Sequence, residues 1–87
     1  MVGLMTGDML MPTIFRFDGY RFYFYSHEPN EPPHVHVDKG GSSMKVWLEP
    51  VAMAKNTGFR RSEINGIIAM VATHRSRLLE AWHEYFG

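Results

Sequence analysis

Strict alternation between apolar and polar residues in two neighbouring segments constrains the fold of this chain more than any other feature. The segments are HVHVD at residues 34–38 and SMKVWLE at residues 43–49. A period of two is typical of β-strands that bury one face and expose the other. Gly40 and Gly41 mark a turn between the segments, and Pro50 ends the second one. The pattern therefore predicts an antiparallel hairpin with one apolar face.

An aromatic region precedes this hairpin and predicts a second one. The runs TIFRFD, residues 13–18, and YRFYFYS, residues 20–26, are rich in β-branched and aromatic residues. Asp18-Gly19 between them is a typical hairpin turn. We therefore expect a four-stranded antiparallel meander, to which a short fifth strand near Met53 can be added.

The hydrophobic period changes to that of a helix after Phe59, and either Arg60 or Ser62 can cap the start. The pattern predicts one helix of about 25 residues, or two helices with a bend near Thr73. Helical coverage of one face of the sheet gives an α+β fold. The apolar stripe of the helix consists of Ile64, Ile67, Ile68, Val71, Leu78, Leu79, Trp82, Tyr85 and Phe86.

A charged residue, Arg75, falls in the middle of this apolar stripe. An unpaired buried guanidinium is strongly destabilising. We therefore expect either a buried charge pair or a bend in the helix that frees the side chain. The candidate partners are Glu49, Asp18 and Glu28.

Length and composition bound the class of protein. The 87 residues suffice for one small domain, expected at residues 11–87, and residues 1–10 are expected to form an extension that need not be ordered. The chain has no cysteine and no apolar run long enough to span a membrane, so we expect a cytoplasmic protein without membrane contact. Nine basic residues balance nine acidic ones, which counts against a general nucleic-acid binder.

The alternation also assigns each strand residue to one face of the sheet. The set expected to face the helix is Phe15, Phe17, Phe22, Phe24, Val35, Val37, Met44, Val46 and Leu48. The opposite face carries the candidate binding residues Tyr23, Tyr25, His34, His36, Lys45 and Trp47. We expect this open, aromatic face to carry the function of the protein.

The runs FYFYSHEPNEPPHVHV, KVWLEPVAMAKNTGF and LLEAWHEYFG resemble the bacterial and archaeal family called domain of unknown function forty-one-sixty. The resemblance extends over nearly all of residues 11–87. It implies a single compact domain that is often encoded beside another small protein, in an arrangement like a toxin-antitoxin pair. It implies no particular activity or ligand. The motif positions are Glu28, Pro32, Pro33, His34, His36, Trp47, Glu49, Pro50, Asn56, Gly58 and Trp82.

Three functions are compatible with the open face. Large exposed aromatic patches usually mark interfaces, which favours an interaction module that binds a small partner protein or associates with itself. The aromatic and basic side chains also suit RNA, and His34, His36 and Glu28 are candidate catalytic groups for metal-independent RNA cleavage. A metal site would combine the two histidines with Glu28 or Asp38. Because the sequence places no third imidazole, we expect no metal or other cofactor.

Overall fold

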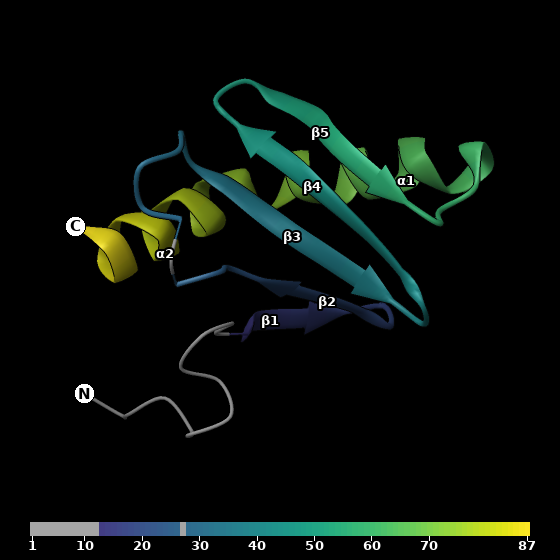
Figure 1. Cartoon of the computed structure of the whole chain (residues 1–87), viewed down its shortest axis with the longest axis horizontal. Coiled ribbons are helices and arrows are strands. Elements are labelled where there is room, and N and C mark those ends of the chain that lie inside the picture. Colours follow the sequence, from purple (N-terminus) through teal and green to yellow (C-terminus); the bar gives the residue numbers. More distant parts are fainter. Residues whose placement is uncertain (1–12, 27) are drawn as a thin grey trace.

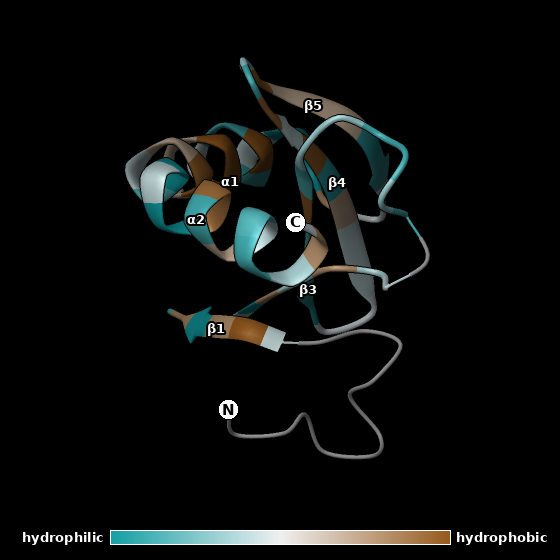
Figure 2. Ribbon diagram, turned by 90° about the vertical axis from the view of Figure 1, so that its left-hand side faces the viewer, coloured by the Kyte–Doolittle hydropathy of each residue, from teal (hydrophilic) through white to brown (hydrophobic). Residues whose placement is uncertain are grey.

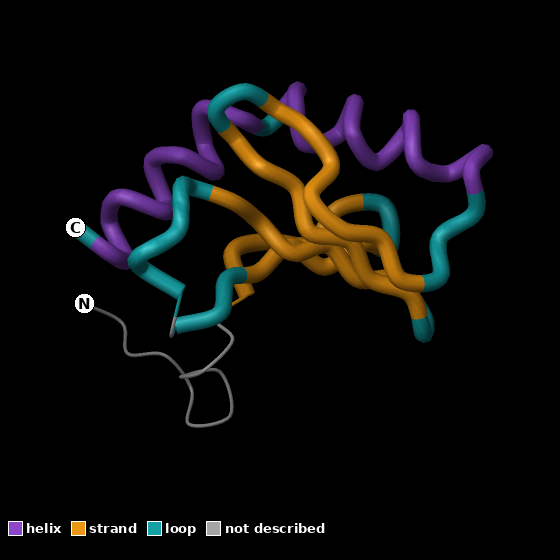
Figure 3. Tube along the Cα trace, turned by 45° about the horizontal axis from the view of Figure 1, so that its top comes forward, coloured by secondary structure: helices purple, strands orange, loops and turns teal. Residues whose placement is uncertain are grey.

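The computed structural model describes residues 13–26 and 28–87, which form a five-stranded antiparallel sheet followed by two helices. The strands lie side by side in chain order: β1 (Thr13–Phe17), β2 (Tyr20–Tyr23), β3 (His34–Lys39), β4 (Ser42–Leu48) and β5 (Val51–Thr57). The helices α1 (Arg61–Thr73) and α2 (Arg75–Phe86) lie across one face of the sheet (Figures 1 and 3). The extension expected at residues 1–10 and the domain start expected at residue 11 lie outside the described residues.

The α+β architecture and the antiparallel meander are confirmed, but the sheet has five strands and not four; the additional strand contains Met53, where a short fifth strand had been allowed for. The chain turns at Glu49-Pro50 and returns as β5, which pairs with β4. β5 is an edge strand, and its residues 52–55 are all exposed. A strand with little burial on either face has no alternation of apolar and polar residues that would reveal it.

The bend predicted near Thr73 is confirmed, since α1 ends at Thr73 and α2 starts at Arg75. His74 lies between the two helices. Its backbone nitrogen and its Nδ1 lie 3.1 and 2.8 Å from the carbonyl oxygen of Met70. The ring of His74 also lies 5.0 Å from the ring of Phe15 on β1. The side chain therefore ends the first helix and attaches the break to the sheet.

The core lies between the sheet and the helices, and both layers are seen from the side in Figure 2. The prediction that Phe22 and Phe24 face the helices is confirmed. These residues are 0% and 1% exposed, and the ring of Phe24 lies 5.3 Å from that of Trp82. Phe17, predicted to lie inward as well, is 47% exposed because it ends the edge strand β1.

Arg75 is paired, as expected, but it is not a buried charge. Its Nε donates to the carbonyl oxygen of Leu48 at 2.7 Å, and its Nη2 lies 3.7 Å from Oε2 of Glu49. The side chains of Arg75 and Glu49 are 41% and 48% exposed. Of the two expected alternatives, the buried charge pair is therefore wrong, and the helix bend that frees the side chain is confirmed, since the helix breaks at His74 directly before Arg75.

Candidate functional site

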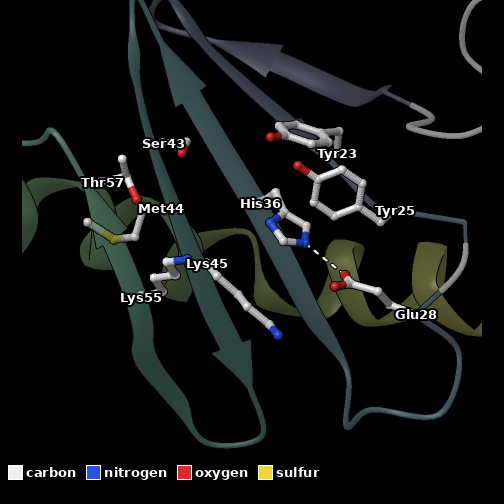
Figure 4. Close-up of a pocket in the computed structure, with 9 residues that line it drawn as sticks. All are labelled: Tyr23, Tyr25, Glu28, His36, Ser43, Met44, Lys45, Lys55 and Thr57. Carbon is white, nitrogen blue, oxygen red and sulfur yellow. Dashed lines mark hydrogen bonds and ion pairs between the residues drawn. The ribbon is translucent and has the colours of Figure 1, made fainter.

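The loop between β2 and β3 brings a carboxylate over the face of the sheet that the helices leave open. The backbone N–H of Glu28 donates to the carbonyl oxygen of Tyr25 at 3.3 Å, which forms a turn. At the other end of the loop, the carbonyl oxygen of Pro33 accepts from the N–H of Leu48 on β4 at 3.0 Å. Both ends are thus attached, and the side chain of Glu28 is directed towards β3 (Figure 4).

Glu28 meets two histidines of β3. His34 and His36 are two residues apart, so their side chains extend from the same side of the strand. Nε2 of His34 lies 2.7 Å from Oε1 of Glu28, and Nε2 of His36 lies 2.9 Å from the same oxygen. The three donor atoms all lie within 4.8 Å of one another. Strand spacing and the loop turn therefore produce one compact cluster, which we call the histidine–carboxylate cluster.

His34 is fully buried, and both of its ring nitrogens face acceptors. Its ring lies between those of Trp82 on α2 and Trp47 on β4, at 5.0 and 5.7 Å. Nδ1 lies 3.0 Å from the carbonyl oxygen of Pro32. A carbonyl oxygen can only accept, so Nδ1 carries a proton. Nε2 faces a carboxylate oxygen at 2.7 Å, so this contact also needs a proton or another cation between the two atoms.

His36 forms the side of the cluster that borders on open space. Its ring stacks on that of Tyr23 at 5.3 Å and meets that of Tyr25 at 4.3 Å. Burial lowers the pKa of His36, and the hydrogen bond to Glu28 opposes this only in part. Burial alone would raise the pKa of Glu28, but the hydrogen bonds from His36 and His34 bring it below its ordinary value. Near neutral pH, a carboxylate therefore faces a neutral His36.

A pocket of about 280 Å³ opens beside His36, on the side of the sheet away from the helices (Figure 4). Tyr23 at the end of β2 and Tyr25 just after it lie on one side of His36. Two lysines from β4 and β5 lie on the other side. The pocket is lined by Tyr23, Tyr25, Glu28, His36, Ser43, Met44, Lys45, Lys55 and Thr57. The carboxylate of the cluster and one of its imidazoles are thus accessible from the pocket.

The hydroxyl group of Tyr23 is not available as a proton donor to a ligand in this pocket. Its hydroxyl donates to Oδ1 of Asp38 at 2.9 Å. Burial, and then this hydrogen bond, raise the pKa of Tyr23 well above its ordinary value. Asp38, one of the two carboxylates that the sequence offered to the histidines, is therefore engaged by Tyr23, and Glu28 takes the place beside His34 and His36.

The residues predicted for the binding face do lie together on this side of the sheet. Those that line the pocket are Tyr23, Tyr25, His36 and Lys45. Trp47 lies beside the pocket: its ring contacts that of His34, and the ammonium of Lys45 lies 4.8 Å from the ring centroid. The predicted face is thus one connected group of side chains.

This face is not open, however, and the expectation of an exposed aromatic surface is wrong at its centre. Tyr23 is 3% exposed, His34 0% and His36 8%. Glu28 lies against His34 and His36, and the ring of Trp82 lies against that of His34. Tyr23 packs against the rings of Tyr25 and His36. The alternation of residues along a strand predicts on which face of the sheet a side chain lies, but it does not predict which other residues cover that face.

Four lining residues were not among the predicted site residues: Ser43 and Met44 of β4, and Lys55 and Thr57 of β5. Lys55 and Thr57 were missed because β5 was expected only as a short strand near Met53. The signal that could have found them is their spacing of two residues in the run VAMAKNT, between the turns at Pro50 and Gly58. This spacing assigns both side chains to one face once the run is taken as a strand.

The fold and the site together define a small α+β domain with a histidine–carboxylate cluster on the face of its sheet away from the helices. The family described as Domain of unknown function (DUF4160) matches residues 19–83, so the chain belongs to this family, as its motifs predicted. Comparisons with curated proteins and with solved structures gave no match. Among the described residues, neither helix is long and apolar enough to cross a membrane.

Proposed function

We propose that this protein binds a divalent transition-metal ion, such as Zn²⁺, through Glu28, His34 and His36. The observation that carries the proposal is the convergence of three donor atoms, since both Nε2 atoms lie within 2.9 Å of Oε1 of Glu28. Because Nδ1–H of His34 donates to the carbonyl oxygen of Pro32, Nε2 is the ring nitrogen that can offer a lone pair to a metal ion beside the carboxylate. A metal ion would satisfy all three donors at once.

The chemistry of the donor set supports this proposal. Two imidazoles and one carboxylate are typical ligands of Zn²⁺ and of other first-row ions with open positions. Bonds of about 2.0–2.2 Å would hold three such donors roughly 3.4 Å apart, so the contacts of both histidines to Oε1 of Glu28 would have to lengthen when the ion binds. The carbonyl oxygen of Pro32 fixes the tautomer of His34, as outer partners of metal-binding histidines do. The pocket beside His36 leaves space for a further ligand.

The other candidate functions require a more accessible surface. Binding of a partner protein, self-association and RNA binding each use exposed aromatic side chains, but Tyr23 is 3% exposed. Metal-independent RNA cleavage needs two groups that reach the substrate, and His34 is 0% exposed. A metal ion can be held by donors that are largely buried. The metal site is therefore the function that this geometry favours.

Titration with Co²⁺ tests the proposal, because the visible absorption of this ion reports its ligands. We expect one bound Co²⁺ per chain. Glu28→Gln and His36→Asn each remove a ligand and should weaken binding by at least about 100-fold, since even outer partners contribute 10- to 100-fold. The matched control is His83→Asn, which alters an exposed histidine of α2 and should leave the affinity unchanged.

Removal of the ion with a chelator should lower the melting temperature but leave the domain folded. Binding to the native state adds stability by mass action, whereas the apolar core is closed by contacts on the other face of the sheet. Circular dichroism measures the retained structure. The proposal is overturned if the wild-type protein binds no Co²⁺, or if Glu28→Gln binds it as tightly as the wild type.

A further inference from the structure

Two lysines stand directly opposite each other in the wall of the pocket. Lys45 of β4 and Lys55 of β5 are Cα partners in the antiparallel ladder. Like charges at directly opposed positions destabilise a sheet. Lys45 is partly compensated by its ion pair with Glu31, whereas Lys55 is exposed and has no acidic partner in the described part of the chain. The wall therefore carries positive charge that the fold itself does not balance.

The next pair along the same ladder adds two hydroxyl groups. Ser43 and Thr57 are also Cα partners, and both line the pocket. Each lies two residues from a lysine, so all four side chains extend from the same face. Ammonium and hydroxyl groups can all donate hydrogen bonds. This wall can therefore bind oxygen atoms that carry negative charge.

We infer that the pocket binds a phosphoryl group between this wall and the metal ion held by Glu28, His34 and His36; the inference rests on the proposed metal site. A phosphoryl group carries nearly two negative charges and three acceptor oxygens at neutral pH. It would offset the repulsion between Lys45 and Lys55 and would ligate the ion from its open side.

The size of the pocket limits the ligand further. Its volume of about 280 Å³ lies just below the usual range for ligand pockets, which begins at about 300 Å³. A small phosphorylated molecule or free phosphate fits such a space, whereas a long polymer would have to lie mostly outside it. A carboxylate carries only one charge and two acceptor oxygens, so it would meet fewer of the four donor side chains in the wall. The charge and the volume therefore favour the same class of ligand.

The test uses the full chain loaded with Co²⁺, titrated with inorganic phosphate and, separately, with phenyl phosphate. Calorimetry and the change in Co²⁺ absorption both measure binding. Lys55→Gln should weaken binding of either anion by at least about 10-fold, because it removes a charged hydrogen-bond donor, and should leave the affinity for Co²⁺ unchanged. The control Lys39→Gln removes one charge from an exposed lysine that lies over Tyr20, outside the pocket, and should change neither affinity.

Some outcomes of this experiment identify the source of the phosphoryl group, and others test the inference itself. Binding of phenyl phosphate assigns a phosphate ester as ligand, whereas binding of inorganic phosphate alone assigns the free ion. The inference is overturned if the loaded protein binds neither anion, or if Lys55→Gln and Lys39→Gln weaken binding equally. The metal site would survive those two results. Failure to bind Co²⁺ in the first place would instead overturn both proposals.

Discussion

Strand β3 buries both of its faces, but by different means. On the helix side, Val35 and Val37 are each 0% exposed and pack into the apolar core. On the opposite side, His34 and His36 are 0% and 8% exposed beneath the loop that carries Glu28. The apolar side needs only matching volume, whereas the polar side needs a partner for each buried nitrogen. The two sides should therefore fail in different ways when a residue is changed.

The difference between the two sides of β3 indicates where the protein can hold a ligand. A buried polar network is stable only when all of its donors and acceptors are satisfied. Here a single oxygen of Glu28 serves His34 and His36 together, and the contact to His34 requires a proton or another cation. The polar side thus depends on the proton or cation that occupies this contact. The apolar side has no such dependence.

Phe22→Ala should give the largest effect, because it opens a cavity on the apolar side. Phe22 is 0% exposed, and its ring stacks on that of Phe15 at 4.6 Å. Such a truncation costs about 3–5 kcal/mol, which approaches the whole stability of a small domain. Urea denaturation measures the loss. The matched control Phe17→Ala removes a phenylalanine that is 47% exposed and should cost less than about 1 kcal/mol; equal losses would contradict the assigned core.

The apolar side of this comparison is the part that the sequence predicts well. Alternation alone reports that Phe22, Val35 and Val46 share one face, because the side chains of a strand point to opposite faces in turn. The helical stripe and the bend near Thr73 follow from the same kind of periodicity. Local sequence is sufficient here because each element buries its apolar side chains in a regular order.

The polar side is predictable only in part. The spacing of His34 and His36 assigns both to one face, but their burial comes from a loop that has no periodicity. Whether Glu28 or Asp38 meets the histidines depends on the turn at Tyr25 and on the bond from Tyr23 to Asp38, which are contacts between distant strands and loops. The sequence identifies the candidate residues of the cluster, but only the tertiary structure shows which of them are in contact.

A smaller effect is expected from Tyr23→Phe, which removes one hydrogen bond on the polar side without opening a large cavity. Tyr23 is 3% exposed and donates to Asp38 at 2.9 Å. A hydrogen bond to a charged group contributes about 1.5–3 kcal/mol, and we expect the lower end because Asp38 is only partly buried. Urea denaturation at neutral pH measures this loss. A change below the error of the measurement would mean that water replaces the hydroxyl at no cost.

The same variant should also change the pH dependence of stability. Burial raises the pKa of Tyr23, so the folded protein keeps its proton where the unfolded chain, with an ordinary value of 10.0, releases it. The stabilisation is therefore complete below about pH 10 and declines as the pH rises further. Tyr23→Phe should lack this part of the decline, whereas Tyr85→Phe, which alters an exposed tyrosine of α2, should retain it. A decline of wild-type size in Tyr23→Phe would assign it to other groups.

The smallest effect should come from a carboxylate whose partner lies in water. The side chain of Glu49 is 48% exposed and its Oε2 lies 3.7 Å from Arg75, whereas the side chain of Glu28 is 17% exposed and contacts two histidines within 2.9 Å. Solvent screening limits exposed ion pairs to about 0–1 kcal/mol. Replacing each glutamate by glutamine therefore compares the loss of an exposed carboxylate with the loss of a largely buried one.

Glu49→Gln should change the free energy of unfolding by less than about 0.5 kcal/mol, because screening already weakens the pair and Arg75 keeps its bond to the carbonyl oxygen of Leu48. Glu28→Gln, measured in the same metal-free buffer, should cost about 1–3 kcal/mol, because it leaves buried imidazole nitrogens without a charged partner. Urea denaturation of both variants gives the comparison directly. Equal costs would show that the buried contacts of Glu28 stabilise the protein no more than the exposed ion pair of Glu49 does. The requirement for a proton or another cation between Glu28 and His34 would then have no support.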